Sequence, residues 1–429
     1  MSRYLLLVPF CVWTMACAAS SESGGTNPPG AGDTGSPLEG DVEDSGSSID
    51  SAVVVTDSAV TATDSIVAAA DSAVAGDSAK ADTAPPSDEC KGYPFSTATL
   101  LAERLGFGAA ATGGEKVYHV TSLANAGTGT LRAALESTES YWIVFDVEGV
   151  ILLDEGSVRV KSNKTVDGRG RSIVIDGNLK IDSGTKNLIF SDVALQYPRG
   201  WKTSDGDTIG IRGHAAADPA AYDSKDFWFH HLDLGRAGDG QLDVRGGTNI
   251  TISWSHMHSH AKSFLHSQDT DSKPSPGMRI TYHHNWFDGI TRRGPLFYYG
   301  YADYFNNWQY HWYEFGASSN SGAQFLSENN IYEARPGTYC IPSCPDPNSP
   351  TGDSDYTVSK EALVSGWAGE PGYIRSVGDL AQEGAKITTN EPTKVFTRAA
   401  HYAAKPDPAG PELKARLKAS TGPRKTYCK

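Results

Sequence analysis

Short runs rich in β-branched and aromatic residues recur through the middle of the chain, each mixing apolar and polar positions. Their starts lie about 22 to 30 residues apart once the segment 200–225 is left out. That spacing is too short for strand–helix–strand units and suits one coil of a parallel β-solenoid, so the pattern predicts an all-β fold. The runs are NLIFSDVAL from 187, DFWFHHLDL from 226, NITISWSHM from 249, RITYHHNWF from 279, ADYFNNWQY from 302 and AQFLSENNIY from 323.

Asparagines recur near the same place in several of these runs, which suits ladders of side-chain amides at the turns of a solenoid. A β-sandwich built from hairpins is the alternative fold. It needs two-residue Asn-Gly or Asp-Gly turns between strands, and few are present. The recurring asparagines are Asn285, Asn306, Asn307, Asn329 and Asn330.

Two segments have helical patterns. GTGTLRAALES, residues 127–137, predicts a helix that caps the exposed N-terminal end of the solenoid. PELKARLKAS, from 411, predicts a short amphipathic helix that packs on the solenoid.

The chain begins with one arginine and an apolar run too short for a membrane span, followed by small residues. We therefore expect residues 1–17 to be a signal peptide and the protein to be secreted. Cys17 could carry a lipid anchor in the cell envelope, although Thr14 and Met15 suit such a cleavage site poorly; anchored and free forms both stay open.

Residues 18–89 are rich in Ser, Ala and Asp and poor in aromatics, which predicts a disordered linker ahead of a folded domain at 90–429. An Asp-Ser pair repeats every seven residues, but a coiled coil would need Leu or Ile at that period. Residues 1–89 hold 14 acidic and 2 basic side chains, net −12, so only −2 of the whole-chain −14 remains for the domain. A nearly neutral domain does not exclude a polyanionic substrate.

Four cysteines fall in the predicted domain, an even number in an oxidising compartment, so two disulfides are plausible. Cys90 with Cys428 would tie the domain ends together, and Cys340 with Cys344 would close a short loop; the pairing stays open.

Several motifs follow one another along the chain: GFGAAATGG, VYHVTSLANAGTGTLRAALE, IVFDVEGVI, NKTVDGRG, DGDTIGI, DFWFHHLDL, DGQLDV, SHAK, RITYHHNWFDG and RGPLFYYG. In this order they resemble pectate lyases of polysaccharide lyase family 1, over about residues 104–332. The resemblance implies a right-handed parallel β-helix and calcium-dependent cleavage of polygalacturonate, the backbone of pectin, by β-elimination, giving 4,5-unsaturated oligogalacturonides. We expect a monomer.

Aspartates supply the oxygen ligands that Ca²⁺ prefers. Asp205 and Asp207 are two residues apart and Asp239 and Asp243 four apart, so in extended segments each pair projects to one face. The resemblance implies Asp207, Asp239 and Asp243 as the main ligands and Asp205 as an accessory one. Each pair alone would be read as ordinary turn residues. Neither segment has the spacing of an EF-hand.

The resemblance also implies roles for cations. Arg293 would take the proton from carbon 5, and Lys262 would pair with a substrate carboxylate. An arginine side chain normally keeps its proton, so this role needs burial and neighbouring cations that favour the neutral form. Arg292 is a further candidate for substrate contact, with a solvated neighbour as the simpler interpretation.

Two positions depart from the family pattern. The family commonly has a second arginine five residues after the first, where this chain has Tyr298, which can stack on a sugar or give one hydrogen bond but cannot form a bidentate clamp. This predicts weaker use of fully charged polygalacturonate or a preference for partly esterified pectin. His230 stands where the family often has aspartate.

Three other functions compete with the lyase. His256, His258 and His260 alternate, so on a strand they would face one way and could bind zinc or copper in a metal-dependent hydrolase, although stacked polar residues explain them more simply. A β-helix glycoside hydrolase would use the paired carboxylates. A non-catalytic carbohydrate-binding solenoid would need neither Arg293 nor Lys262. No basic stripe indicates nucleic-acid binding.

Overall fold

The structure is a computed structural model. It describes residues 95–154, 156–202, 206–214, 217–266, 276–337, 344–345, 353–354 and 358–424. The predicted signal peptide, the linker 18–89, the lipid anchor at Cys17 and the disulfide candidates Cys90, Cys340 and Cys428 lie outside these residues, as does the side chain of Cys344. None of the helices in the described ranges combines the length and apolarity needed to cross a bilayer.

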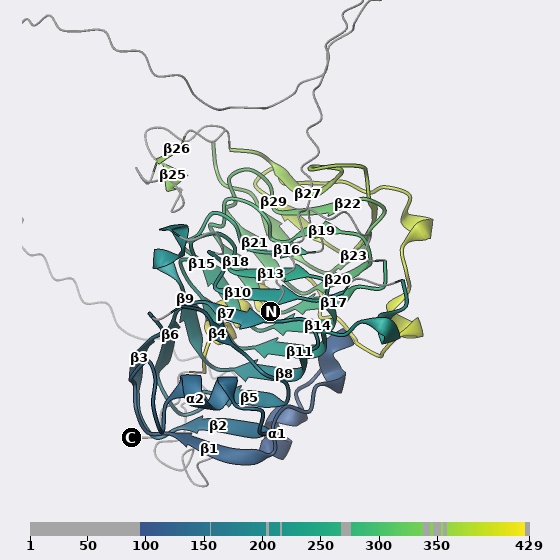
Figure 1. The fold of residues 1–429 in the computed structure, drawn as a ribbon. Coiled ribbons are helices and arrows are strands. Elements are labelled where there is room, and N and C mark those ends of the chain that lie inside the picture. Colours follow the sequence, from purple (N-terminus) through teal and green to yellow (C-terminus); the bar gives the residue numbers. More distant parts are fainter. Residues whose placement is uncertain are drawn as a thin grey trace, which may run out of the picture. The chain divides into compact units, whose positions relative to one another are not determined.

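Three parallel sheets stack their strands along one axis, and each coil of the chain contributes in turn to each sheet, as Figure 1 shows for strands from β1 to β29. This is a parallel β-helix, and connections between parallel strands of one sheet are almost always right-handed. The predicted all-β solenoid is confirmed, and the predicted runs lie on the first and third sheets.

The strands of each sheet follow in spatial order. The first sheet comprises β1 (Lys116–Val120), β2 (Tyr141–Phe145), β5 (Lys164–Asp167), β8 (Lys186–Ser191), β11 (Lys225–His230), β14 (Thr248–Ser253), β17 (Arg279–His283), β20 (Tyr301–Phe305), β23 (Gln324–Glu328) and β28 (Tyr373–Val377). The second comprises β4 (Val158–Arg159), β7 (Leu179–Ile181), β10 (Ile209–Arg212), β13 (Leu242–Arg245), β16 (Leu265–His266), β19 (Leu296–Tyr298), β22 (Ala317–Asn320), β27 (Glu361–Ser365) and β30 (Lys386–Ile387). The third comprises β3 (Gly149–Leu152), β6 (Ile173–Asp176), β9 (Ala194–Gln196), β12 (Asp233–Leu234), β15 (His256–His258), β18 (Trp286–Asp288), β21 (Trp308–Tyr310), β24 (Ile331–Glu333) and β29 (Leu380–Gln382). A short antiparallel ladder joins β25 (Cys344–Pro345) to β26 (Asp353–Ser354).

The core is a set of side-chain columns that run along the axis. Because the strands pair in parallel and in register, residues at the same position of successive coils stack on one another. One column of the first sheet is fully buried and almost entirely large and apolar. It consists of Leu188, Phe227, Ile250, Ile280, Ala302, Phe325 and Ile374.

Terminal segments cover part of the outer face of the first sheet. Leu100 and Ala111 pack on Trp142, Ile189 and Trp228 in a second buried cluster. Both faces of these strands are therefore buried, which explains why their sequences read as apolar runs without strict alternation.

Left-handed residues turn the chain from the first sheet to the third. His284, Asn306 and Asn329 have φ values of 56, 54 and 52°. The residue after each is an inward-facing asparagine, and the amide of Asn285 donates to Asn307 Oδ1 at 2.9 Å, while that of Asn307 donates to Asn330 Oδ1 at 3.0 Å. The predicted amide ladder is confirmed for these inward asparagines.

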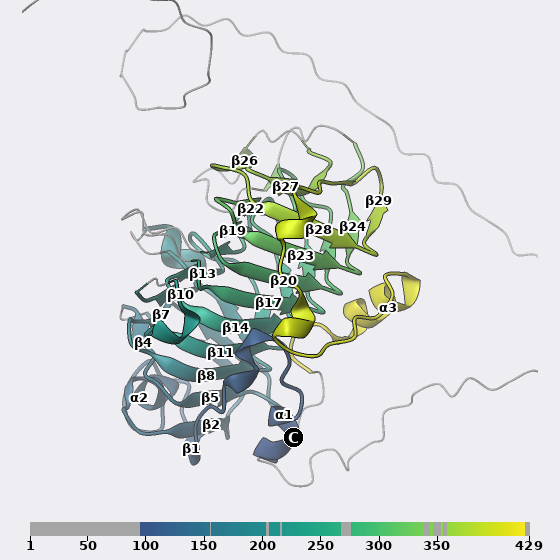
Figure 2. The same cartoon turned by 90° about the vertical axis from the view of Figure 1, so that its right-hand side faces the viewer.

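The helices pack on the solenoid. Helix α2 (Leu131–Glu136) buries Leu131, Ala134 and Leu135 against the core at the β1 end, which confirms the predicted cap. Helix α3 (Pro411–Ser420) buries Leu413 and Leu417 with Trp308 and Ile331, as predicted, and lies beside the third sheet in Figure 2. Helix α1 (Thr97–Leu101) was not predicted.

We expect Asn307→Leu to lower the free energy of unfolding by at least about 2 kcal/mol. The change leaves the buried backbone N–H of Asn285 without its acceptor, at about 1–3 kcal/mol, and removes one of the two acceptors of the Asn285 side-chain amide. Urea denaturation measures the loss. Gln324→Leu, at a half-buried position of β23, is the control, and equal losses in both variants would show that the ladder adds nothing.

Candidate functional site

Two loops on neighbouring coils form the base of the site, each leading into a strand of the second sheet. The loop before β10 contains Asp207, and the loop before β13 contains Asp239. The backbone N–H groups of Gly238 and Asp239 donate to the carbonyl of Gly206 at 2.9 and 3.0 Å. Because Gly210 pairs with Asp243 in the ladder, the two loops lie in register at the same edge of the sheet.

Three carboxylates converge at this edge. One oxygen from each of Asp207, Asp239 and Asp243 lies within 4.8 Å of the others. Asp207 and Asp243 are buried, with 2% and 0% of their surfaces exposed. Asp205 lies outside the described residues, so its predicted accessory role stays a prediction.

Gly240 makes room for this convergence. A Cβ atom at this position would lie 2.3 Å from Asp243 Oδ1 and 3.0 Å from Asp207 Oδ1. The backbone N–H of the same glycine donates to Asp207 Oδ1 at 2.8 Å. A side chain here would force the carboxylates apart, so the glycine is part of the site.

The surroundings shift the pKa values of two of these carboxylates in opposite directions. Burial, together with the charge of Asp207, raises the pKa of Asp243 to about 8. Its Oδ2 is buried and has no hydrogen-bond partner among the residues that the structure describes, and Arg245 Nη2 lies 4.0 Å away. At Asp239, burial acts to raise the pKa, but the hydrogen bond and charge of Lys262 outweigh it and lower the pKa below its usual value.

The two cations expected at the site are present there. Lys262 Nζ lies 2.7 Å from Asp239 Oδ1. Arg293 has a left-handed backbone (φ 63°), its carbonyl accepts a hydrogen bond from the N–H of Phe264 at 2.7 Å, and its charge acts on both Asp239 and Asp243. Arg293 Nη1 is buried without a hydrogen-bond partner, so one donor of the guanidinium group is unused within the described protein.

The other two predicted substrate contacts are engaged within the protein. Arg292 Nη1 pairs with Glu314 at 2.7 Å, so the arginine is neither fully solvated nor unpaired. Tyr298 is 6% exposed, and its hydroxyl donates to the carbonyl of Ala368 at 2.8 Å. The loop 366–371 lies against the tyrosine ring. In this structure Tyr298 is therefore packed within the protein, and its contact with substrate stays a prediction.

A buried amide, which the sequence analysis did not identify, holds the site loops together. Gln241 is fully buried, and its Nε2 donates to the carbonyls of Leu234 and Gly235 at 2.6 and 2.9 Å. Its Oε1 accepts a hydrogen bond from Ser263 Oγ at 2.7 Å, beside Lys262. The position of Gln241 directly after Asp239 and Gly240 is the feature of the sequence that could have indicated this role, because one side-chain amide can donate to several loop carbonyls.

The three alternating histidines divide between two places. His256 and His258 point outward from β15 and contact Asp233. Ser259 has a left-handed backbone (φ 55°), which ends the alternation, and His260 Nε2 instead contacts the carbonyl oxygen of Asp239. The prediction that all three face one way is therefore wrong, because the chain turns between the second and the third.

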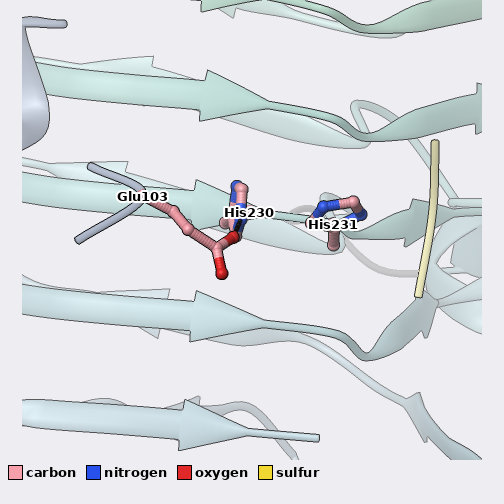
Figure 3. A group of neighbouring side chains, drawn as sticks. All are labelled: Glu103, His230 and His231. Atoms are coloured by element: carbon pink, nitrogen blue, oxygen red, sulfur yellow. Dashed lines mark hydrogen bonds and ion pairs between the residues drawn. The ribbon is translucent and has the colours of Figure 1, made fainter. Parts of the chain in front are cut away.

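His230, His231 and Glu103 form a separate group, shown in Figure 3. His230 Nε2 lies 2.8 Å from Glu103 Oε2, and His231 Nδ1 donates to the carbonyl of Gly422 at 2.8 Å. Arg424 pairs with Glu103 at 3.0 Å and with Asp192 at 2.7 Å. Burial lowers the pKa values of both histidines, that of His231 to about 3. Because a guanidinium already neutralises the carboxylates, we interpret this group as a structural contact between distant segments.

Fold and site together define a class of protein: a parallel β-helix with a buried three-carboxylate cluster and adjoining cations at one sheet edge. A family model described as pectate lyase matches residues 147–349. The chain is 33% identical over 246 residues to a pectate lyase of Nicotiana tabacum, covering 54% of this chain and 62% of that protein, which is less than two thirds of its length. It is 30% identical over 309 residues to probable pectate lyase 5 of Arabidopsis thaliana, covering 66% and 69%. The chain belongs to the pectate lyase family.

Solved structures share the fold. The major allergen Jun a 1 from cedar pollen aligns with a TM-score of 0.57 at 23% identity, covering 76% of this chain and 94% of that one. A pectate lyase from Bacillus sp. N165, in complex with trigalacturonate, aligns with a TM-score of 0.53 at 20% identity, covering 74% and 98%.

We expect the stability of the metal-free protein to depend on Asp243. Its pKa is about 8 when folded and near the ordinary 3.8 when unfolded, so between these values the folded state binds more protons. The free energy of unfolding therefore falls as pH rises through this window. The amide of Asp243→Asn does not titrate. The free energy of unfolding of this variant, minus that of the parent, therefore rises from about pH 4 to about pH 8 and then levels off. Urea unfolding of both proteins in chelator measures the difference, and a difference independent of pH would contradict the assignment.

Proposed function

We propose that the protein is a calcium-dependent pectate lyase that cleaves polygalacturonate by β-elimination and releases 4,5-unsaturated oligogalacturonides. The observation that carries this proposal is the convergence of three carboxylates with Lys262 and Arg293 at one edge of the second sheet. Membership of the pectate lyase family and the trigalacturonate complex of the Bacillus protein support the substrate class.

The acidic cluster fits a divalent cation. Asp207, Asp239 and Asp243 offer hard oxygen ligands, and within the described part of the chain the buried Asp243 Oδ2 has no hydrogen-bond partner. Like charges buried together cost free energy unless a cation balances them. When bound, Ca²⁺ supplies positive charge that neutralises the substrate carboxylate and stabilises the enolate-like intermediate.

The remaining steps belong to side chains. Lys262 lies beside Asp239, where its ammonium group can pair with a uronate carboxylate. Arg293 is the group that accepts the proton from carbon 5. The electron pair of that C–H bond forms the double bond between carbons 4 and 5, the bond from carbon 4 to the glycosidic oxygen breaks, and that oxygen takes a proton from water.

Two alternatives fit the site less well. A glycoside hydrolase needs two carboxyl groups on opposite sides of the scissile bond, about 5–9.5 Å apart. Here three carboxylates crowd within 4.8 Å, and Asp243 is fully buried. A non-catalytic binding solenoid leaves the unused donor of Arg293 without a role.

We propose further that the enzyme acts outside the cell. A polymeric substrate cannot cross a membrane unaided, which agrees with the signal-like start of the sequence. Lipid anchorage at Cys17 stays a prediction.

The decisive experiment follows the absorbance of unsaturated uronide ends, with the full chain on polygalacturonate, in calcium and in chelator. We expect calcium-dependent growth of absorbance, and a loss of at least about 100-fold in kcat for Arg293→Ala because the proton acceptor is removed.

Arg292→Ala is the matched control, and we expect it to keep most of the activity because its guanidinium pairs with Glu314. Circular dichroism checks that both variants fold. New reducing ends without the absorbance would indicate a hydrolase, and no cleavage of polygalacturonate or pectin would favour the binding protein.

We expect partly esterified pectin to be a better substrate than fully charged polygalacturonate. Tyr298 replaces the family's second arginine, and its hydroxyl is occupied by Ala368, so this position offers no cation to a second substrate carboxylate. Rates on polymers of graded esterification measure the preference. Tyr298→Phe should leave the profile unchanged, and a strict preference for the unesterified polymer would contradict the proposal.

A further inference from the structure

We propose a second metal site on the outer face of the third sheet, where Asp233, His256 and His258 bind a divalent transition metal such as Zn²⁺. The proposal stands on the geometry of these side chains and does not rest on the lyase activity.

Strand register brings the three residues together. Asp233 of β12 pairs with His256 of β15, and His258 pairs with Asp288 of β18. Met257, between the histidines, points into the core with no exposed surface. Both histidines and both aspartates therefore project from the same outer face, about a third of each aspartate side chain being exposed.

The ligand atoms are already close to one another. Asp233 Oδ1 lies 2.7 Å from His258 Nε2, and Asp233 Oδ2 lies 3.5 Å from His256 Nδ1. One ligand atom from each of the three residues lies within 4.8 Å of the other two. A cation bound between these atoms would replace the contacts that the two imidazoles make with Asp233.

The second nitrogen of each imidazole ring also has a partner. His256 Nε2 lies 3.4 Å from Asp288 Oδ2, and His258 Nδ1 lies 2.9 Å from Ser259 Oγ. Histidines that bind metals usually have this arrangement, because a hydrogen bond at one nitrogen orients the ring and selects the tautomer whose other nitrogen binds. The sequence alone did not reveal these partners.

Neighbouring groups fix the rings and leave access. The ring of His256 stacks between those of His258 and Trp286, with centroids 4.6 and 4.4 Å away. A cavity of about 450 Å³ opens beside Asp233 and His256, and Lys418 also lines it. Three protein ligands with an open position suit a tetrahedral ion that binds water or an anion as its fourth ligand.

The donor set distinguishes this site from the calcium site. Two imidazoles and a carboxylate suit Zn²⁺, Cu²⁺ or Ni²⁺, whereas Ca²⁺ prefers oxygens alone. It also differs from the group of Glu103, His230 and His231, where the guanidinium of Arg424 already occupies the carboxylate.

The test is calorimetric titration of Zn²⁺ into the full chain, prepared without a histidine tag and held in saturating calcium. We expect one Zn²⁺ ion per chain. His256→Ala and His258→Ala should each lower its affinity at least about 10-fold, because removing a ligand costs no less than removing the partner of a ligand. Zn²⁺ should also raise the melting temperature of the parent and not of these variants.

His119→Ala is the matched control, since His119 pairs with Asp146 and belongs to none of the groups of three metal-ligating side chains found among the described residues. Asp288→Asn keeps the side-chain shape and should weaken Zn²⁺ binding by about 10- to 100-fold through His256. Co²⁺ bound to the unaltered protein should show the strong visible absorption of a four-coordinate site. Absence of Zn²⁺ binding, an affinity in both histidine variants equal to that of the unaltered protein, or the weak spectrum of octahedral Co²⁺ would overturn the proposal.

Discussion

Parallel, in-register pairing between successive coils is the constraint on which the rest of the structure depends. Each residue has its ladder partners one coil before and one coil after it, so side chains far apart in sequence become fixed neighbours. The same register builds the apolar column through Phe227 and Ile250, aligns Asn285 with Asn307, and brings Asp207 against Asp243. The strand register that builds the core therefore also positions the side chains of the candidate site.

The register also explains why the protein can bury charge. In an isolated strand the carboxylate of Asp243 would stay in water. Pairing of β10 with β13 holds Asp243 in the sheet near Asp207, and Gly240, which has no side chain, leaves room for the two carboxylates to approach each other. Burying these carboxylates costs free energy. Burial of the apolar columns in the core offsets that cost, since it contributes about 25 cal/mol per Å² of apolar area. The scaffold thus supplies the free energy that keeps these carboxylates buried together.

Much of this arrangement was predictable from the sequence. The runs from 187 to 332 and the inward asparagines indicated the successive coils of the solenoid, because the same local pattern repeats in each coil. Asp207, Asp239 and Asp243 could be grouped because motif order reflects coil order. These features depend on residues within one coil or on its repetition.

Other features depend on contacts that no local pattern records. The burial of Tyr298 depends on Ala368, 70 residues later, and the split between His258 and His260 depends on a left-handed turn at Ser259. Glu103 meets His230 only because the N-terminal segment folds over the first sheet. In each case the conformation depends on a contact or turn outside the local pattern. The sequence shows which residues are present there but not where they lie in space.

The contact of Arg424 with Glu103 has a consequence for how the protein comes apart. In a linear stack of repeats, each coil is held only by its neighbours, so the ends open first and opening spreads inward. Here Arg424, near the end of the described chain, forms hydrogen bonds with Glu103, 321 residues earlier and near its beginning. It also forms hydrogen bonds with Asp192, which lies between them in the sequence. These contacts join the two terminal segments of the described chain to the same part of the first sheet, beside β8 and β11. Detaching the last segment therefore also removes a contact that holds the first one on the flank of the solenoid.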